Sequence, residues 1–161
     1  MDFFNQYSYV IISLIALAAS AAILRRRVNA RAAAAALLAL AALLLAGNLL
    51  LRPGASDVQN AGDAVTVIES GGQPTVLEFF SNFCAGCLAV RPLVDQLAAE
   101  VAGEFSFVRV DVHSEVGHSL RERYGFSYTP EFIVFDAAGR EVWRAHTLPD
   151  AGALDLARAG T

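Results

Sequence analysis

Two long segments without a charged side chain, residues 3–24 and 32–51, open this chain of 161 residues. As helices rising about 1.5 Å per residue, each would be about 30 Å long, close to the thickness of a bilayer's hydrocarbon core. The second segment is almost entirely Ala and Leu, and its leucines favour membrane insertion by roughly 3–5 kcal/mol. We therefore expect residues 1–51 to form a transmembrane hairpin. Aromatic side chains near its start suit a membrane interface: Phe3, Phe4, Tyr7 and Tyr9.

The short connection at residues 25–31 carries four arginines, whereas only Arg52 directly follows the second segment. The positive-inside rule predicts that this connection is cytoplasmic, so that both termini lie outside. Two alternatives stay open: the first segment could be a signal peptide, or the second could be an embedded signal cleaved near Gly47 or Ala55. A buried soluble hairpin is less favoured because neither segment has a polar face.

The remainder of the chain has an ordinary, acidic composition. Residues 52–62 read as a linker rich in turn-forming residues, which would let the next domain approach the membrane surface. Residues 63–161 suffice for one compact domain and not for two. An acidic domain without basic clusters argues against nucleic acid as a partner.

Hydrophobic patterning predicts an α/β domain whose mixed sheet has helices on both faces. Helices are expected over residues 84–102, over 114–124 between a Ser114 cap and a Gly125 stop, and from an Asp150 cap to Ala159. The expected strands are residues 65–68, 75–81, 105–112, 132–135 and 141–144.

The chain's only cysteines, Cys84 and Cys87, lie where a buried strand passes into a helix. The free N–H groups and the dipole at a helix N-terminus favour a thiolate, so we expect the pKa of Cys84 to lie below that of a free thiol. Half of a zinc site is an alternative, but zinc needs four ligands, and the histidines at positions 113, 118 and 146 read as solvated surface residues. A purely structural disulfide is a second alternative.

Four features in order resemble thioredoxin over about residues 65–144. They are TVLEFFSNFCAGC at 75–87, Arg91-Pro92 in the following helix, FVRVDV at 107–112, and YGFSYTPEFIVFD followed by AAGREV at 124–142. The resemblance implies a thioredoxin fold after the hairpin. Because residue 65 would open the sheet directly, we expect the family's N-terminal helix to be missing or vestigial.

The resemblance also implies site residues. Thr129-Pro130 corresponds to the family's cis-proline turn, whose preceding backbone meets the substrate, and Phe83 and Phe126 offer it apolar contact. A trans proline is the alternative reading. Glu78 is similar to the family's buried acid that relays a proton for the second cysteine, although thioredoxin usually has Asp there. The alternative is a satisfied Glu at the sheet edge, and Arg109 is expected to be a solvated strand residue.

The expected function is disulfide reduction by a membrane-tethered thiol–disulfide oxidoreductase with Cys84, Cys87 and Glu78 as catalytic residues. Its partners would be protein disulfide substrates and a membrane-embedded electron donor, with no cofactor or metal. By resemblance, the chain is similar to tethered proteins of a bacterial-type inner membrane that act in cytochrome c maturation. The alternatives are an oxidase or isomerase of the same fold and a non-enzymatic membrane adaptor.

Overall fold

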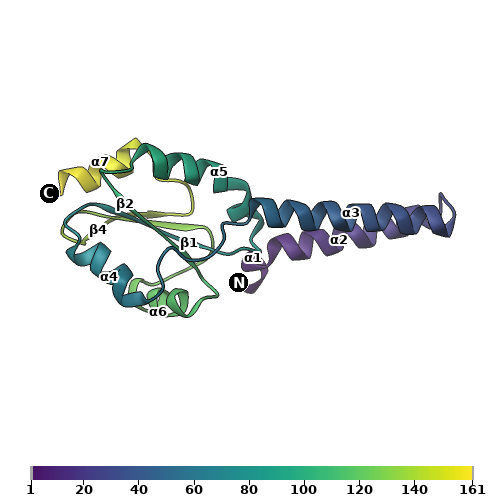
Figure 1. The fold of residues 1–161 in the computed structure, drawn as a ribbon, viewed down its shortest axis with the longest axis horizontal. Helices are drawn as coiled ribbons and strands as arrows, with labels where there is room; N and C mark the ends of the chain where they lie inside the picture. The colour runs from purple at the N-terminus through teal and green to yellow at the C-terminus, as the bar shows by residue number, and fades with distance from the viewer. Residues whose placement is uncertain (1, 161) are drawn as a thin grey trace.

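The computed structural model describes residues 2–160, so Met1 and Thr161, the outer ends of the predicted hairpin and domain, lie outside the described residues. A helical hairpin projects from one side of an α/β domain (Figure 1). The N-terminal residues lie at the junction between the two parts, and the C-terminal helix lies at the far side of the domain.

The domain contains a four-stranded mixed sheet in the order β2-β1-β3-β4. Strand β1 (Thr75–Phe80) pairs in parallel with β2 (Ser106–Asp111) and antiparallel with β3 (Glu131–Phe135). Strand β4 (Glu141–Ala145) is antiparallel to β3 at the sheet edge. Every residue of β1 and β3 is buried, as expected of central strands that are covered on both faces.

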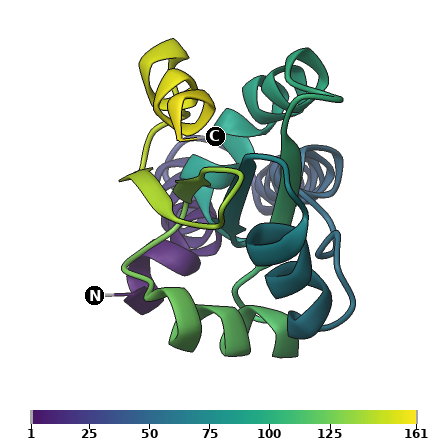
Figure 2. The ribbon, with the colours of Figure 1, turned by 90° about the vertical axis from the view of Figure 1, so that its left-hand side faces the viewer.

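Two pairs of helices cover the sheet (Figures 1 and 2). Helices α4 (Ala61–Ser70) and α6 (Glu115–Tyr124) pack on the face that carries Leu77 and Phe79 of β1. Helices α5 (Ala85–Glu100) and α7 (Ala151–Ala159) pack on the opposite face, which carries Val76. The predicted caps of α6 and α7 are confirmed, because the side chains of Ser114 and Asp150 accept hydrogen bonds from the first helical turns.

The prediction of a strand at residues 65–68 is wrong, because these residues lie within helix α4. The run Val65-Thr66-Val67-Ile68 favours a strand by its β-branched residues, but the helix buries Ala64 and Ile68 four positions apart on the sheet. Asn60 caps the helix by accepting from the N–H of Asp63. The helix that was expected to be missing before the sheet is therefore present.

The predicted first span, residues 3–24, is divided into two helices. Helix α1 (Asp2–Gln6) ends before Tyr7, and α2 (Ser8–Leu24) continues as a 17-residue apolar helix. Helix α3 (Ala30–Leu51) has 22 residues and is the one helix among residues 2–160 that is long and apolar enough to cross a membrane. Large apolar side chains on the hairpin are exposed, with Leu38 72% and Leu50 76% exposed.

The predicted linker, residues 52–62, is shorter than expected because α4 begins at Ala61. Its chain is also held along the edge of β2. The N–H of Asp57 donates to the carbonyl of Arg109 at 2.9 Å, and the N–H of Asp111 donates to the Ser56 hydroxyl at 3.0 Å. The segment is therefore held on the domain at residues 56 and 57 rather than acting as a loose tether.

Candidate active site

Cys84 occupies the N-cap position of α5, directly after the turn that follows β1. Its Sγ accepts a hydrogen bond from the N–H of Cys87 at 3.2 Å and lies 3.6 Å from the carbonyl oxygen of Thr129. Both thiols are free and buried against Phe80. The fold thus places the first cysteine where the free N–H groups of a helix start converge on its sulfur.

The pKa values of the two thiols are shifted in opposite directions. A hydrogen bond from the Cys87 thiol, assisted by the N–H groups of Cys87 and Gly86, lowers the pKa of Cys84 to about 6 even though burial opposes ionisation. Burial, together with the adjacent Cys84 sulfur, raises the pKa of Cys87 far above its usual range. At neutral pH about nine tenths of Cys84 would be thiolate, while Cys87 stays protonated. The expected nucleophile is therefore Cys84.

Glu78 lies in β1 between Val76 and Phe80, and its side chain is on the sheet face that α5 covers. It is only 1% exposed, and its Oε2 has no hydrogen-bond partner among the described residues. Burial raises the pKa of Glu78 to about 8, and the negative charge of Cys84 adds to this increase. The predicted burial of Glu78 is confirmed, and the satisfied edge position is not what the structure shows.

Arg109 does not behave as the predicted solvated residue. It is directly opposite Glu78 in the β1–β2 register, and its guanidinium lies 2.6 Å from Asp95 and 3.5 Å from Asp57. Its positive charge lowers the pKa of Glu78 and so partly offsets the effect of burial. Strand alternation gave no signal for this arrangement, because it depends on carboxylates from α5 and from the segment before α4.

The predicted cis peptide between Thr129 and Pro130 is confirmed. Thr129 is 1% exposed, and the Pro130 carbonyl lies 2.9 Å from Nδ1 of His146, which is half-buried rather than solvated. Phe83 is next to Cys84 and is 40% exposed. The ring of Phe126, by contrast, packs edge-on against Phe79 at 5.5 Å in the core under α4 and α6. Phe126 is therefore a half-buried residue packed against this core, on the sheet face away from the cysteines.

The N-terminal segment makes a further set of contacts around the site, which the sequence did not indicate. The side chain of Asn5 hydrogen-bonds the backbone of Thr129, and the ring of Tyr7 stacks on Phe83 at 5.7 Å. The Ser8 hydroxyl accepts from the N–H of Ala85 at 2.9 Å. His113 also belongs to this group, with its ring 5.1 Å from Tyr7. No pattern in the sequence indicates contacts between residues more than seventy positions apart.

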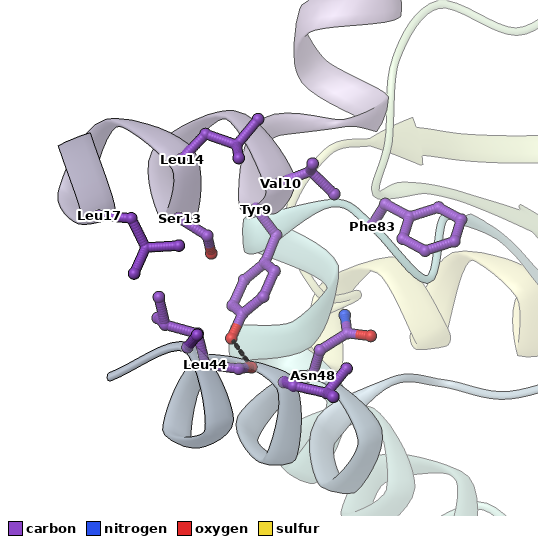
Figure 3. Close-up of a pocket in the computed structure, with 10 residues that line it drawn as sticks. Tyr9, Val10, Ser13, Leu14, Leu17, Leu44, Asn48 and Phe83 are labelled. Atoms are coloured by element: carbon purple, nitrogen blue, oxygen red, sulfur yellow. Dashed lines mark hydrogen bonds between the residues drawn. The ribbon is translucent and has the colours of Figure 1, made fainter. Parts of the chain in front are cut away.

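An apolar groove of about 280 Å³ runs between α2 and α3 and reaches Phe83 (Figure 3). The Tyr9 hydroxyl crosses it and donates to the Leu44 carbonyl at 2.6 Å. Asn48, at the same end, donates to the Asn82 carbonyl at 2.9 Å, two residues before Cys84. The hairpin therefore meets the domain at its cysteine-bearing end.

Cys84 favours the thiolate at a helix start, Cys87 stays protonated three residues later, and Glu78 is a buried acid near them. These are the features of a thiol–disulfide oxidoreductase site. Among residues 2–160, no three His, Cys, Asp or Glu side chains gather as metal ligands. Residues 60–148, more than half of the chain, match the thioredoxin family. The chain therefore belongs to the thioredoxin family.

Comparisons with individual proteins agree with this assignment. The chain is 33% identical to the chloroplastic thioredoxin M4 of Arabidopsis thaliana over 50% of its own length and 42% of the relative's. It is 27% identical to a thiol:disulfide interchange protein, a TxlA homologue of Synechocystis, over 54% of its length and 48% of the relative's. The chain thus spans less than half of either relative. The crystal structure of spinach chloroplast thioredoxin F shares the fold, with a TM-score of 0.52 at 22% identity over 63% of this chain and 82% of the other.

Proposed function

We propose that the protein reduces protein disulfides through Cys84 and Cys87. The Cys84 thiolate attacks one sulfur of the substrate disulfide and releases the other sulfur as a thiolate, forming a mixed disulfide. Cys87 then loses its proton and attacks the Cys84 sulfur. The second substrate thiol leaves, two electrons have passed to the substrate, and a Cys84–Cys87 disulfide remains. The opposite acidities of the two thiols are the observation that carries this proposal.

Glu78 is proposed as the base that takes the proton from Cys87. Because the pKa of Glu78 is about 8, most of this carboxyl is protonated at neutral pH while Cys84 is a thiolate. The mixed disulfide removes the negative charge of Cys84, which is one of the groups that raise the pKa of Glu78. Ionisation of Glu78 therefore becomes easier at the step that needs a base.

We further propose that α2 and α3 anchor the protein in a bacterial-type inner membrane, with the domain and both termini on the extracytoplasmic side. The open apolar surface of the hairpin and the arginines at residues 25–27 and 31 support this orientation. The cysteines would then face the membrane surface. Reducing electrons would come from a membrane-embedded donor, and the substrates would include proteins of cytochrome c maturation.

A second candidate, disulfide formation by the same site, is favoured by one observation. A pKa of about 6 for Cys84 stabilises the reduced protein, and stabilising the dithiol makes the disulfide form a stronger oxidant. The reduction potential decides between the two. A value near about −270 mV supports a reductase, and a value near about −120 mV supports an oxidase.

Trapping tests the reductase proposal most directly. In Cys87→Ser, the mixed disulfide has no resolving thiol and should accumulate on Cys84, where mass spectrometry identifies the partner. The double variant Cys84→Ser/Cys87→Ser is the matched control and should trap nothing. If Cys87→Ser traps no more than the control, and wild type reduces insulin no faster than Cys84→Ser, the proposed chemistry is wrong. A reporter fused to the C-terminus tests the topology separately.

A further inference from the structure

The N-terminal segment of the chain lies against the residues that surround Cys84. Although Cys84 is the expected nucleophile, it is only 1% exposed. The segment Asn5–Tyr9, which we call the N-terminal cap, hydrogen-bonds the turn at residues 81–85 and Thr129, whose carbonyl oxygen lies 3.6 Å from the Cys84 sulfur. This segment joins α1 to the start of α2, so it belongs to the hairpin rather than to the domain.

The side-chain amide of Asn5 hydrogen-bonds the backbone of Thr129 as a peptide group of a neighbouring strand would. Its Nδ2 donates to the Thr129 carbonyl at 2.8 Å, and its Oδ1 accepts from the Thr129 N–H at 2.8 Å. The Thr129 hydroxyl adds a third hydrogen bond to the same oxygen at 2.9 Å. The side-chain amide thus uses the backbone donor and acceptor of Thr129 that an extended substrate would need.

The rest of the cap contacts the turn that carries Cys84. The Gln6 carbonyl accepts from the Ser81 hydroxyl at 2.9 Å, and the Ser8 hydroxyl accepts from the Ala85 N–H at 2.9 Å. The Tyr9 N–H donates to the Phe83 carbonyl at 2.9 Å, and the Tyr7 ring stacks on the Phe83 ring. Five consecutive residues therefore bind Thr129 and the turn at residues 81–85 through polar contacts and one aromatic contact.

We infer that the N-terminal cap occupies the surface around Cys84 that a substrate would bind, and that the cap must leave before a disulfide can reach Cys84. The inference rests on the proposed function, because it assigns this surface to a disulfide-bearing partner. The contacts of the cap also describe that partner: an extended segment that pairs with the Thr129 backbone and places a large apolar or aromatic side chain on Phe83. A small substrate that offers neither contact does not displace the cap.

Alkylation of the reduced full-length protein in detergent micelles tests the inference without requiring disulfide reduction. Asn5→Ala removes three neutral hydrogen bonds from the closed state and should raise the rate at which N-ethylmaleimide modifies Cys84 about tenfold, equivalent to about 1.4 kcal/mol. Ser8→Ala removes one and should raise it about threefold, equivalent to roughly 0.6 kcal/mol. Asn29→Ala, whose side chain caps α3 at the far end of the hairpin, is the matched control and should leave the rate unchanged.

Mapping the modified cysteine separates opening of the cap from unfolding. Release of the cap exposes Cys84 while Cys87 stays protected, whereas unfolding exposes both thiols together. Unchanged rates in both Asn5→Ala and Ser8→Ala, or equal modification of Cys84 and Cys87, would overturn the inference. If Asn5→Ala speeds alkylation of Cys84 and yet no variant reduces insulin, the cap stands and the proposed reductase function fails.

Discussion

Glu78 should contribute a loss of stability as the pH rises, and replacing this buried acid should remove that contribution. The pKa of Glu78 is raised from 4.5 to about 8 in the folded protein. Between these two values the unfolded chain has released the proton that the folded protein still holds, so the contribution of Glu78 to stability falls as the pH increases. Glu78→Gln keeps the size of the side chain but cannot ionise.

The magnitude follows from the two pKa values. At pH 7, Glu78 is ionised in the unfolded chain but mostly protonated in the folded protein. This difference lowers the free energy of unfolding by roughly 3 kcal/mol, from about 1.4 kcal/mol per pKa unit. Glu78→Gln should therefore be close to wild type in stability at about pH 4 and more stable by roughly 3 kcal/mol at pH 7. Above about pH 8, where Glu78 is ionised in both states, the difference should level off.

Denaturant unfolding in micelles, followed by fluorescence, measures this difference. The single tryptophan, Trp143, lies in β4 and packs against the core under α5 and α7, so it reports on the domain rather than on the hairpin. Glu122→Gln, at an exposed position of α6, is the matched control and should show no such dependence. A stability difference between Glu78→Gln and wild type that stays constant from about pH 4 to about pH 8 would refute the reasoning.

Two further predictions concern the charge of Arg109 and the packing of Gly117 in α6. Arg109→Gln removes a positive charge that lowers the pKa of Glu78. When the stability of Arg109→Gln is compared with that of the double variant Arg109→Gln/Glu78→Gln, the pH at which their difference levels off should therefore be higher than in the wild-type background. An unchanged pH would mean that Arg109 does not act on Glu78. Gly117→Ala should destabilise the domain by about 2–4 kcal/mol in the same unfolding assay, because its new Cβ would lie 2.1 Å from the Asp111 carbonyl oxygen. Gly152→Ala, whose Cβ has only an ordinary contact at 3.4 Å, should stay within about 0.5 kcal/mol of wild type, and equal effects would contradict the packing argument.

Local sequence patterns predicted much of the domain. Buried strands read as apolar runs, and the caps at Ser114 and Asp150 marked helix starts, because these signals depend on near neighbours. The Cys84–Cys87 pair was predicted from its place at a helix start, whereas the cis proline followed from resemblance to a family. The prediction of a strand at residues 65–68 was wrong. A few β-branched residues do not decide between strand and helix when packing on the sheet favours a helix with one apolar face.

The contacts of the N-terminal cap could not be predicted in this way. The break at Tyr7 has no proline or glycine to signal it, and it coincides with the stacking of Tyr7 on Phe83. Asn5 and Thr129 are 124 positions apart, so only the folded structure reveals that they pair. The same holds for Arg109, whose carboxylate partners come from two other segments. Each of these features is a contact between distant segments, which leaves no periodicity in the sequence.

The most direct test of the account is the ionisation of Cys84. Thiolate absorbance in the ultraviolet, measured against pH for the reduced protein and corrected with Cys84→Ser, reports ionisation whether or not the cap is closed. The account predicts a midpoint at about pH 6, and an upward shift in Cys87→Ala, which lacks the thiol that donates to Cys84. A wild-type midpoint at the ordinary thiol value, unchanged in Cys87→Ala, would contradict it.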